Sequence, residues 1–415
     1  MSKSSRPSIQ LFDLLSDEAR YFPERLYKKM HAAGPIVRSK LPLIGKVWMF
    51  TTYDACVKLL RDHDRFARDS RRAGRKFVAD FLRFMPRGVR SLSKNMISVD
   101  GDEHTRLRSL VEQAFRKQTI EVMRPRLIEI CDRFLDELPA HADADGVVNL
   151  ETHFARVYPL EVISELLGLP EGDRPDFARL GQRLSSVRSL MSLLSAFPSL
   201  WNLKTYLQTQ IAKCRAKPRP GLLGAMIQAE AAGDRLTTEE LLSMSFLLLL
   251  AGHETTSQLI VTTIGTLLVA PDQLQILKND WSLATSAVEE ILRYVSPIQI
   301  SKPRMCTADF EYHGQQMKRG EYAIAMIGAA NHDPAQFTEP DRFDLTRDPN
   351  PHLSFGSGIH TCLGLKLARA EAEIALERLV TRYPNISIQS PTGQLNWSGR
   401  IGMRTLDSLP VQIEL

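Results

Sequence analysis

The chain has 415 residues, of which 43% are hydrophobic and 24% are charged, and a formal net charge of +5. These values are ordinary for a globular protein, so they exclude a disordered chain, and the modest charge does not call for a nucleic-acid partner. The composition barely changes along the sequence, which shows no internal repeat. We therefore expect one large domain over residues 1–415, with an ordered core over residues 11–415.

The five cysteines are an odd, widely spaced set without a CxxC pair. This pattern argues against a disulfide framework and against structural zinc. Residues 1–10 are polar and lack the apolar stretch of a signal peptide, and the longest apolar run, 246–252, is far too short to cross a bilayer. We expect a cytoplasmic protein without a membrane anchor.

Apolar residues recur at intervals of three and four over most of the chain, so the predicted fold is mainly α. The predicted helices, in chain order, cover residues 54–60, 106–114, 121–138, 150–167, 239–269, 284–294 and 363–383. Two alternating or β-branched stretches, 35–50 and 310–327, predict strands of a small β region beside the helices. Turn residues at 313–314 and 319–320 divide the second stretch.

Two segments do not fit a regular element. Segment 65–94 carries ten basic residues against Asp69 and Asp80, with phenylalanines between them. It is consistent with a cover over a binding site and equally with a solvated basic face. In segment 185–207, apolar residues crowd around Pro198, as where two helices meet at a bend. Core packing and a lid over an apolar cavity both explain this segment.

The predicted helix at 239–269 begins with a capping box, in which Thr237 and Glu240 satisfy each other's backbone N–H groups. At about 30 residues it is long enough to cross the whole domain. The helix therefore has a buried middle, where polar side chains would carry a cost.

An acid and two hydroxyls, in Ala251-Gly-His-Glu-Thr-Thr256, occupy that middle directly after the apolar run. Burying them is unfavourable unless a function compensates. Gly252 removes side-chain bulk, and Thr255 can donate back to a carbonyl of the preceding turn, which would open the helix into a groove. Taken alone, Glu254 and Thr255 could equally form an exposed turn of a surface helix.

Two charged pairs lie at helical spacing. Glu290 and Arg293 stand at i and i+3 on the helix before Pro297, and His104 and Arg108 stand at i and i+4. In isolation each is an ordinary surface pair, worth about 0.2–0.5 kcal/mol for the ion pair.

The segment 351–364 holds three glycines within nine residues and then passes into a predicted helix. Cys362 therefore sits at a helix N-terminus, where exposed N–H groups and the helix dipole lower a thiol's pKa and favour a metal-binding thiolate. Gly356 and Gly358 would let the backbone approach a flat ligand closely, and Phe355 could shield the sulfur from water. A lone cysteine is more often a small buried hydrophobic residue.

The pattern Phe355-Gly-x-Gly-x-His-x-Cys-x-Gly364 resembles the haem-binding signature of the cytochrome P-450 family. The resemblance covers residues 11–415 in the motif order of soluble bacterial members. It implies the cytochrome P-450 fold, with a long central helix over a haem b held by the cysteine loop. It assigns the cofactor-binding loop to Phe355, Gly356, Gly358, His360, Cys362 and Gly364, with Cys362 as the iron ligand and His360 as a propionate donor.

The resemblance also gives roles to the other motifs. Thr255 would steady oxygen at the iron, and Glu254 would help to relay protons from solvent. Glu290 and Arg293 look like the family's ExxR pair, with Arg342 completing a buried charge cluster of structural role. His104, Arg108 and Arg304 would bind the haem propionates.

The implied function is a haem-thiolate monooxygenase that inserts one atom of O2 into an apolar organic substrate. Because the sequence has no flavin- or nicotinamide-binding glycine fingerprint, the resemblance implies a separate ferredoxin and its reductase as electron donors. A haem-thiolate sensor or carrier without turnover is the alternative, and a helical protein without haem is a third reading. We expect a monomer. An acidic ferredoxin would dock on a basic proximal face made of Arg106, Arg116, Lys117, Lys366 and Arg369.

The segments expected to line the substrate pocket are mainly apolar; they are 77–98, 185–207, 247–255, 298–302 and 401–402. They favour a polyketide or macrolide, fatty-acyl, terpenoid or steroid-like substrate. The arginines around 71–76 would suit a carboxylate or the phosphate of an acyl carrier.

Overall fold

The computed structural model describes residues 9–41, 44–74, 92, 95–116, 119–174, 177, 179–180, 197–231, 234–390 and 392–414. Contacts group the chain into two compact units. Unit 1 consists of Met1–Asp80, Thr262–Leu365 and Ser390–Leu409, and unit 2 consists of Phe81–Val261, Lys366–Gln389 and Pro410–Leu415. The expected single domain over 1–415 stays a prediction.

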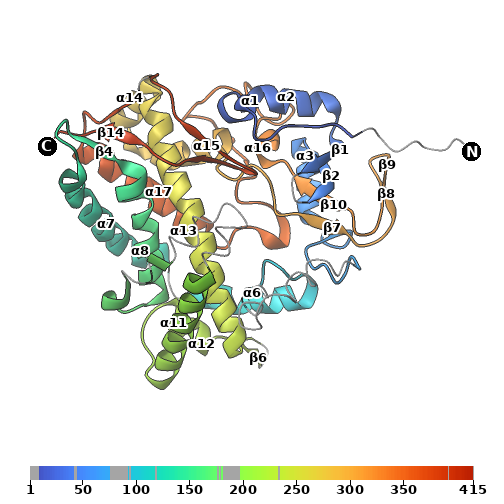
Figure 1. Cartoon of the computed structure of the whole chain (residues 1–415), viewed down its shortest axis with the longest axis horizontal. Coiled ribbons are helices and arrows are strands. Elements are labelled where there is room, and N and C mark those ends of the chain that lie inside the picture. The colour runs from blue at the N-terminus through green and yellow to red at the C-terminus, as the bar shows by residue number, and fades with distance from the viewer. Residues whose placement is uncertain are drawn as a thin grey trace, which may run out of the picture. The chain divides into compact units, whose positions relative to one another are not determined.

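Unit 1 contains a mixed sheet whose strands lie in the order β1-β2-β10-β7-β3 (Figure 1). The strands are β1 (Ile36–Leu41), β2 (Gly45–Phe50), β3 (Phe66–Ala67), β7 (Arg304–Cys306) and β10 (Tyr322–Ala325). The predicted strand region 35–50 is the antiparallel pair β1–β2, and β10 runs parallel to β2. The region 310–327 also contains the hairpin of β8 (Phe310–Tyr312) and β9 (Gln315–Met317), which turns at residues 313–314 as predicted.

Both faces of this sheet are covered, because successive apolar side chains of β2 point to opposite faces and all of them are buried. Val47 and Met49 pack in a core cluster with α2, whereas Trp48 and Phe50 pack in a second cluster with α3. The helices of unit 1 are α1 (Asp17–Tyr21), α2 (Pro23–Ala33), α3 (Tyr53–Arg61), α14 (Pro271–Asn279), α15 (Ala284–Tyr294) and α16 (Ile327–Ala330). A hairpin of β12 (Trp397–Arg400) and β13 (Met403–Leu406) completes this unit.

Unit 2 is mainly helical. The helices that the structure describes in it are α6 (Gly101–Arg116), α7 (Ile120–Glu137), α8 (Val157–Leu167), α11 (Phe197–Ala216), α12 (Leu222–Gln228) and most of α17 (Leu365–Arg382). Its strands are β4 (Val147–Asn149), β11 (Ser387–Ile388) and β14 (Pro410–Gln412), which form one small sheet, and the pair β5 (Glu230–Ala231) and β6 (Asp234–Arg235). The predicted helix at 150–167 is divided, because a π-helical turn, Glu151–Ala155, precedes α8.

The longest helix is α13 (Thr238–Leu268), close to the predicted 239–269. Its capping box is confirmed. The N–H of Glu240 donates to the Thr237 hydroxyl at 3.2 Å, and the N–H of Thr237 donates to the Glu240 carboxylate at 2.9 Å. Pro271 follows and begins α14, because proline is tolerated at the first position of a helix but not in its interior.

Residues 75–91 and 93–94 of the basic segment and 185–196 of the apolar segment lie outside the described residues, so the hypotheses about both segments stay open. Within the described ranges, no single helix is both long and apolar enough to cross a membrane. Among the helices that the structure describes, the pair α13 and α14 taken together reaches that length and apolarity, and the two are bent by 102° where they meet.

Candidate active site

The cysteine loop, residues 351–364, leads directly into α17. The side chain of Cys362 is exposed, and its backbone N–H donates to the carbonyl oxygen of Phe355 at 2.9 Å. Gly356 has a φ of +74°, and a Cβ atom there would meet only the carbonyl oxygen of His360, at 4.0 Å. The loop thus presents an accessible sulfur beside backbone that carries no side-chain bulk.

Gly358 serves a different contact, with the end of α3. Its φ is +79°, and a Cβ atom would lie 2.6 Å from the carbonyl oxygen of Leu60. Arg61, the last residue of α3, donates from Nε to the hydroxyl of Ser357 at 2.9 Å. The loop can approach α3 this closely only because position 358 has no side chain.

The five cysteines are free, and Cys362 alone among them is exposed. Burial raises the pKa of the Cys306 thiol to about 12 and also raises the pKa of Cys56 and Cys131, because a buried thiolate loses its hydration. These thiols stay protonated at neutral pH. An accessible thiol next to glycine backbone is the type of donor that a haem iron takes as an axial thiolate, so the loop fits that group.

A buried asparagine, Asn331, connects α15 to the start of the cysteine loop. Its Nδ2 donates to the hydroxyls of Ser296 and Ser354, at 2.8 and 2.9 Å, and its Oδ1 accepts from the N–H of Leu353 at 2.8 Å. Ser354 donates in turn to the carbonyl oxygen of Leu292. Sequence reasoning missed this residue. Its only signal was a polar run that begins directly after an apolar one.

Glu290 and Arg293 form an ion pair on α15 at 2.8 Å, with both side chains 0% exposed. Arg347 completes the cluster, since its Nε lies 3.2 Å from the second oxygen of Glu290. The backbone N–H of Asp344 also donates to Glu290, at 3.0 Å, and this bond holds the chain after residue 343 against α15. Arg347 can therefore reach the buried carboxylate.

The predicted role of the Arg342 side chain was wrong. This side chain is 60% exposed and pairs with Glu339 at 3.3 Å, so hydration rather than burial stabilises its charge. Arg342 contributes its backbone instead, because its carbonyl oxygen accepts from Arg293 at 3.0 Å. Spacing alone did not distinguish Arg342 from Arg347.

The three residues predicted to bind propionates have different surroundings. Arg304 is fully buried in unit 1 and donates to the carbonyl oxygen of Leu60 at 2.9 Å. In unit 2, His104 is buried on α6, and Arg108 donates to Glu112, one turn further on, at 2.6 Å. Propionate binding by these residues stays a prediction.

The predicted back-bond of Thr255 is confirmed, because its hydroxyl donates to the carbonyl oxygen of Ala251 at 2.6 Å. We expected this bond to open the helix, but the chain remains α-helical through this stretch. Gly252 permits helix packing, since a Cβ atom there would lie 2.7 Å from Cδ1 of Ile163 on α8. Glu254 is partly exposed. The acid and the alcohol thus follow each other on a helix that packs closely against α8.

A family model described as Cytochrome P450 matches residues 39–396. The chain belongs to the cytochrome P450 family. This confirms the resemblance of the cysteine loop and the predicted fold class. The protein is a haem-binding oxidoreductase of the monooxygenase type that defines this family.

Its relatives cover nearly the whole chain. The 6-deoxyerythronolide B hydroxylase of Saccharopolyspora erythraea is 34% identical over 97% of this chain and 98% of its own length. The structure of cytochrome P450 PksS from the bacillaene polyketide synthase of Bacillus subtilis 168 matches with a TM-score of 0.87 at 34% identity, covering 97% of this chain and 100% of that one. The structure of P450BioI in complex with hexadec-9Z-enoic acid ligated acyl carrier protein matches with a TM-score of 0.84 at 31% identity, covering 96% and 100%.

The basic face expected on this P450 is only partly available. Arg116 and Lys366 are exposed, and Arg369 is half-buried. Arg106 forms an ion pair with an acid of α13, which offsets its charge. Lys117 lies outside the described residues.

Two of the segments expected to line the P450's substrate pocket, 298–302 and 401–402, do meet within unit 1. The N–H of Gln299 donates to the carbonyl oxygen of Gly402 at 2.8 Å, and a Cβ atom at Gly402 would press into the side chain of Ile300. Segment 247–255 lies on α13, and most of 77–98 falls outside the described residues. That these segments line a substrate pocket stays a prediction.

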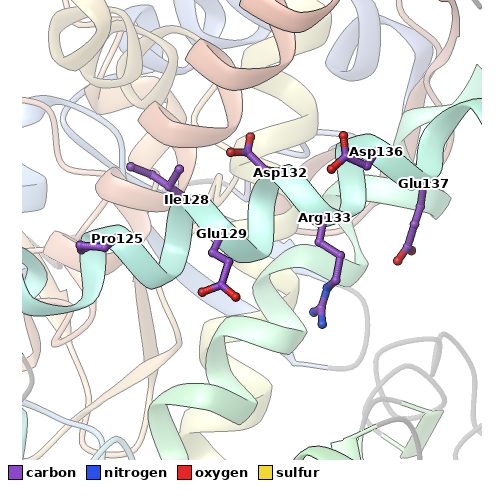
Figure 2. A pocket seen from close by; sticks show the side chains of 7 residues that line it. All are labelled: Pro125, Ile128, Glu129, Asp132, Arg133, Asp136 and Glu137. Carbon is purple, nitrogen blue, oxygen red and sulfur yellow. The ribbon is translucent and has the colours of Figure 1, made fainter.

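An open groove of about 650 Å³ runs along α7 but does not suit a P450 substrate (Figure 2). Asp132 and Asp136 project to the same side of the helix, and each is neutralised by an arginine of α17, Asp132 by Arg378 at 2.7 Å and Asp136 by Arg382. A solvent-facing groove lined by paired charges lacks the enclosed apolar walls that bind an organic substrate.

Proposed function

We propose that this P450 inserts one atom of O2 into an apolar organic substrate, chiefly as a hydroxyl group, with haem b as its resident cofactor. The observation that carries the proposal is the exposed thiol of Cys362 in a glycine-lined loop. Cys362 would hold the iron as a thiolate. His104, Arg108, Arg304 and His360 would donate hydrogen bonds to the propionates. When bound, the haem supplies the redox chemistry that activates O2.

Thr255 and Glu254 provide the proton chemistry in this proposal. Because the Thr255 hydroxyl gives its hydrogen to Ala251, its oxygen lone pairs can accept a hydrogen bond from water or from a protonated group. Glu254 is partly exposed, so its carboxylate can exchange protons with solvent. The alanine variant T255A should uncouple electron consumption from product formation. In a haem-thiolate sensor or carrier, T255A would change neither electron consumption nor product formation.

The decisive experiment is the absorption spectrum of the reduced protein with carbon monoxide. Thiolate ligation moves the main haem band far to the red, and this band should disappear in C362A together with product formation. The serine variant of a buried cysteine, C56S, should keep both. A C362A protein that retained the shifted band would refute the proposal.

The electrons would come from a ferredoxin and its reductase, since the chain carries no flavin- or nicotinamide-binding glycine fingerprint. Arg116 and Lys366 are the exposed charges available to an acidic ferredoxin. Reversing both charges should slow reduction and weaken its salt dependence. Unchanged rates at every ionic strength would exclude this docking face. Cytoplasmic location and a monomeric state stay predictions.

The relatives span several of the expected substrate classes, since they include a vitamin D(3) 25-hydroxylase and a structure in complex with testosterone, so a polyketide or macrolide, fatty-acyl, terpenoid or steroid-like substrate stays open. The named activities include a 6-deoxyerythronolide B hydroxylase, and the P450BioI structure holds a carrier-tethered fatty acid. Arg71 is already engaged by Asp69, with contacts of 2.5–2.9 Å, so recognition of a carboxylate near 71–76 would need this ion pair to open. Binding titrations of a fatty acid and its methyl ester test whether these arginines recognise a carboxylate, and equal affinities would contradict this proposal.

A further inference from the structure

Helix α3 holds the cysteine loop at two places, both within unit 1. The hydroxyl of Tyr53, the first residue of the helix, donates to the carbonyl oxygen of Pro351 at 2.7 Å, where the loop begins. Nε of Arg61, the last residue of the helix, donates to the hydroxyl of Ser357 at 2.9 Å, near the middle of the loop. A helix of nine residues is about 14 Å long and stiff, so its two ends keep these two points of the loop at a fixed separation.

The helix itself is anchored by buried side chains that do not belong to the loop. At its start, the N–H of Tyr53 donates to the carboxylate of Asp333 at 2.8 Å, and Asp333 is buried. At its end, the carbonyl oxygen of Leu60 is one of the last four, which have no partner inside a helix. The buried Arg304 donates to it at 2.9 Å. Since both ends of α3 are held by the core, the helix can serve as a fixed support for the loop.

The turn that carries the sulfur meets this support at its middle. It closes on itself through the N–H of Cys362, which donates to the carbonyl oxygen of Phe355 at 2.9 Å. Between these two residues, Gly358 lies so close to α3 that a Cβ atom there would clash with the helix backbone. Its neighbour Ser357 receives the bond from Arg61. The contact of Gly358 sets how closely the turn approaches α3, and the directional bond of Arg61 sets its orientation.

Two exposed cations on α3 differ in whether they reach the loop. Arg61 is exposed, and its Nε bond goes to a neutral hydroxyl of the loop. Lys58, about one turn earlier, is also exposed, but its ion pair with Asp54, at 2.7 Å, stays within α3. Exposed polar side chains of this kind contribute little to the stability of a fold. A comparison of the two residues therefore separates an effect on the loop from an effect of surface charge.

We propose that Arg61 is a positioning residue for the iron-binding thiolate: through Ser357 it orients the turn that carries Cys362, while Tyr53 holds the start of the loop. The strength of a metal–thiolate bond depends on how the surrounding shell fixes the ligand. A turn that has lost its bond to α3 is therefore expected to release the thiolate more readily. This inference rests on the proposed role of Cys362 as the iron ligand, and it adds one end of α3 to the groups that determine that role.

The test is the lifetime of the red-shifted carbon monoxide band of the reduced holoprotein in urea below the unfolding transition. R61M keeps the length of the side chain but removes the donor, and the lifetime should fall about 3- to 10-fold, as expected for the loss of one hydrogen bond. R61Q should restore the lifetime, because Nε2 of glutamine occupies the same place along the side chain as Nε of arginine and can donate without a charge. The matched control K58M should behave like the wild type.

S357A removes the acceptor of the same bond and should shorten the lifetime by the same factor. The double variant R61M/S357A should be no worse than either single variant, because both substitutions remove one shared interaction. Equal lifetimes in wild type, R61M and S357A would overturn the positioning role and leave the thiolate assignment intact. A urea unfolding midpoint of R61M that falls together with the lifetime would also overturn it, since Arg61 would then act on stability alone. A wild-type holoprotein without the red-shifted band would overturn both this inference and the proposed function.

Discussion

Two glycines of the cysteine loop, although both have positive φ, are required for different reasons. Gly356 leaves open space where a side chain would stand, whereas Gly358 touches the backbone of α3. A left-handed conformation costs a non-glycine residue about 1–2 kcal/mol, and a clash with rigid backbone adds a further cost. The two glycines look equivalent in the sequence motif, but only Gly358 is in close contact with the backbone of α3.

We expect G358A to lower the free energy of unfolding by about 2–4 kcal/mol, because strain and the clash with the Leu60 carbonyl add together. G356A is the matched control and should cost only about 1–2 kcal/mol. Urea unfolding of both variants, with haem content measured in parallel, tests the difference. Equal losses in the two variants would contradict the role assigned to the α3 contact.

Glu371 on α17 is a buried acid outside the predicted site. It is 2% exposed, and its Oε2 has no hydrogen-bond partner. Burial raises the pKa of Glu371 well above its usual value of 4.5. The folded state therefore keeps the proton to a higher pH than the unfolded state does, and stability falls as the pH rises above 4.5.

We expect E371Q to be more stable than the wild type at neutral pH, because glutamine resembles the protonated acid and has no proton to lose. This advantage should shrink as the pH falls toward 4.5, where the unfolded state is also protonated. Thermal unfolding across this pH range measures it. A constant difference at every pH would show that Glu371 does not titrate on unfolding.

At the scale of elements, the segment from Pro340 to Asn350 is attached to α15 through one buried carboxylate. Glu290 receives bonds from Arg293, Arg347 and the side chain of Asn350, the last at 3.1 Å. This attachment precedes the cysteine loop directly in the chain, and Asn331 holds the start of the loop to the same helix. The position of the cysteine thus depends on side chains far from it in sequence.

We expect R347M to destabilise the protein by about 3 kcal/mol, because it leaves a buried carboxylate with one charged partner fewer. R342M should cost less than about 1 kcal/mol, since the lost ion pair is exposed and the carbonyl oxygen that binds Arg293 remains. Urea unfolding distinguishes the two. A larger loss in R342M would restore the original assignment of the third arginine.

At the scale of the whole molecule, each unit contains, among the described residues, a buried histidine whose pKa is lowered by its burial. In unit 2, burial lowers the pKa of His253 to about 4, and its Nε2 contacts the carbonyl oxygen of Arg156 at 2.9 Å. In unit 1, burial lowers the pKa of His332 to about 3, and its Nδ1 contacts the carbonyl oxygen of Gly328 at 2.9 Å. Both units therefore oppose protonation of a core histidine.

We expect the free energy of unfolding to fall as the pH drops below 6.5, the usual histidine value. Below that pH the histidines of the unfolded chain bind protons, whereas the buried histidines of the folded protein stay neutral. Each such group lowers the free energy of unfolding by about 1.4 kcal/mol per pH unit, until the pH reaches about 4 for His253. H253Q should flatten this slope, whereas H313N, at an exposed histidine, should leave it unchanged. An unaltered slope in H253Q would exclude the histidine as its cause.

What the sequence by itself determined about this protein came mainly from patterns of residues that lie close together in the chain. The cysteine loop, the acid–alcohol pair and the capping box of α13 each depend on residues close together in the chain. Helical periodicity also located α13 and α15 to within about one residue, because burial of one helix face repeats at a fixed interval. The strand pair at 35–50 followed from the same kind of repeat.

Only the tertiary structure decided which side chains meet across long stretches of chain. It selected Arg347 over Arg342 as the partner of Glu290, set Gly358 against α3, and joined the end of α3 to the cysteine loop. Sequence spacing does not encode these contacts, because the energy of a charge depends on whether its surroundings are water or protein. That difference exists only after the chain has folded.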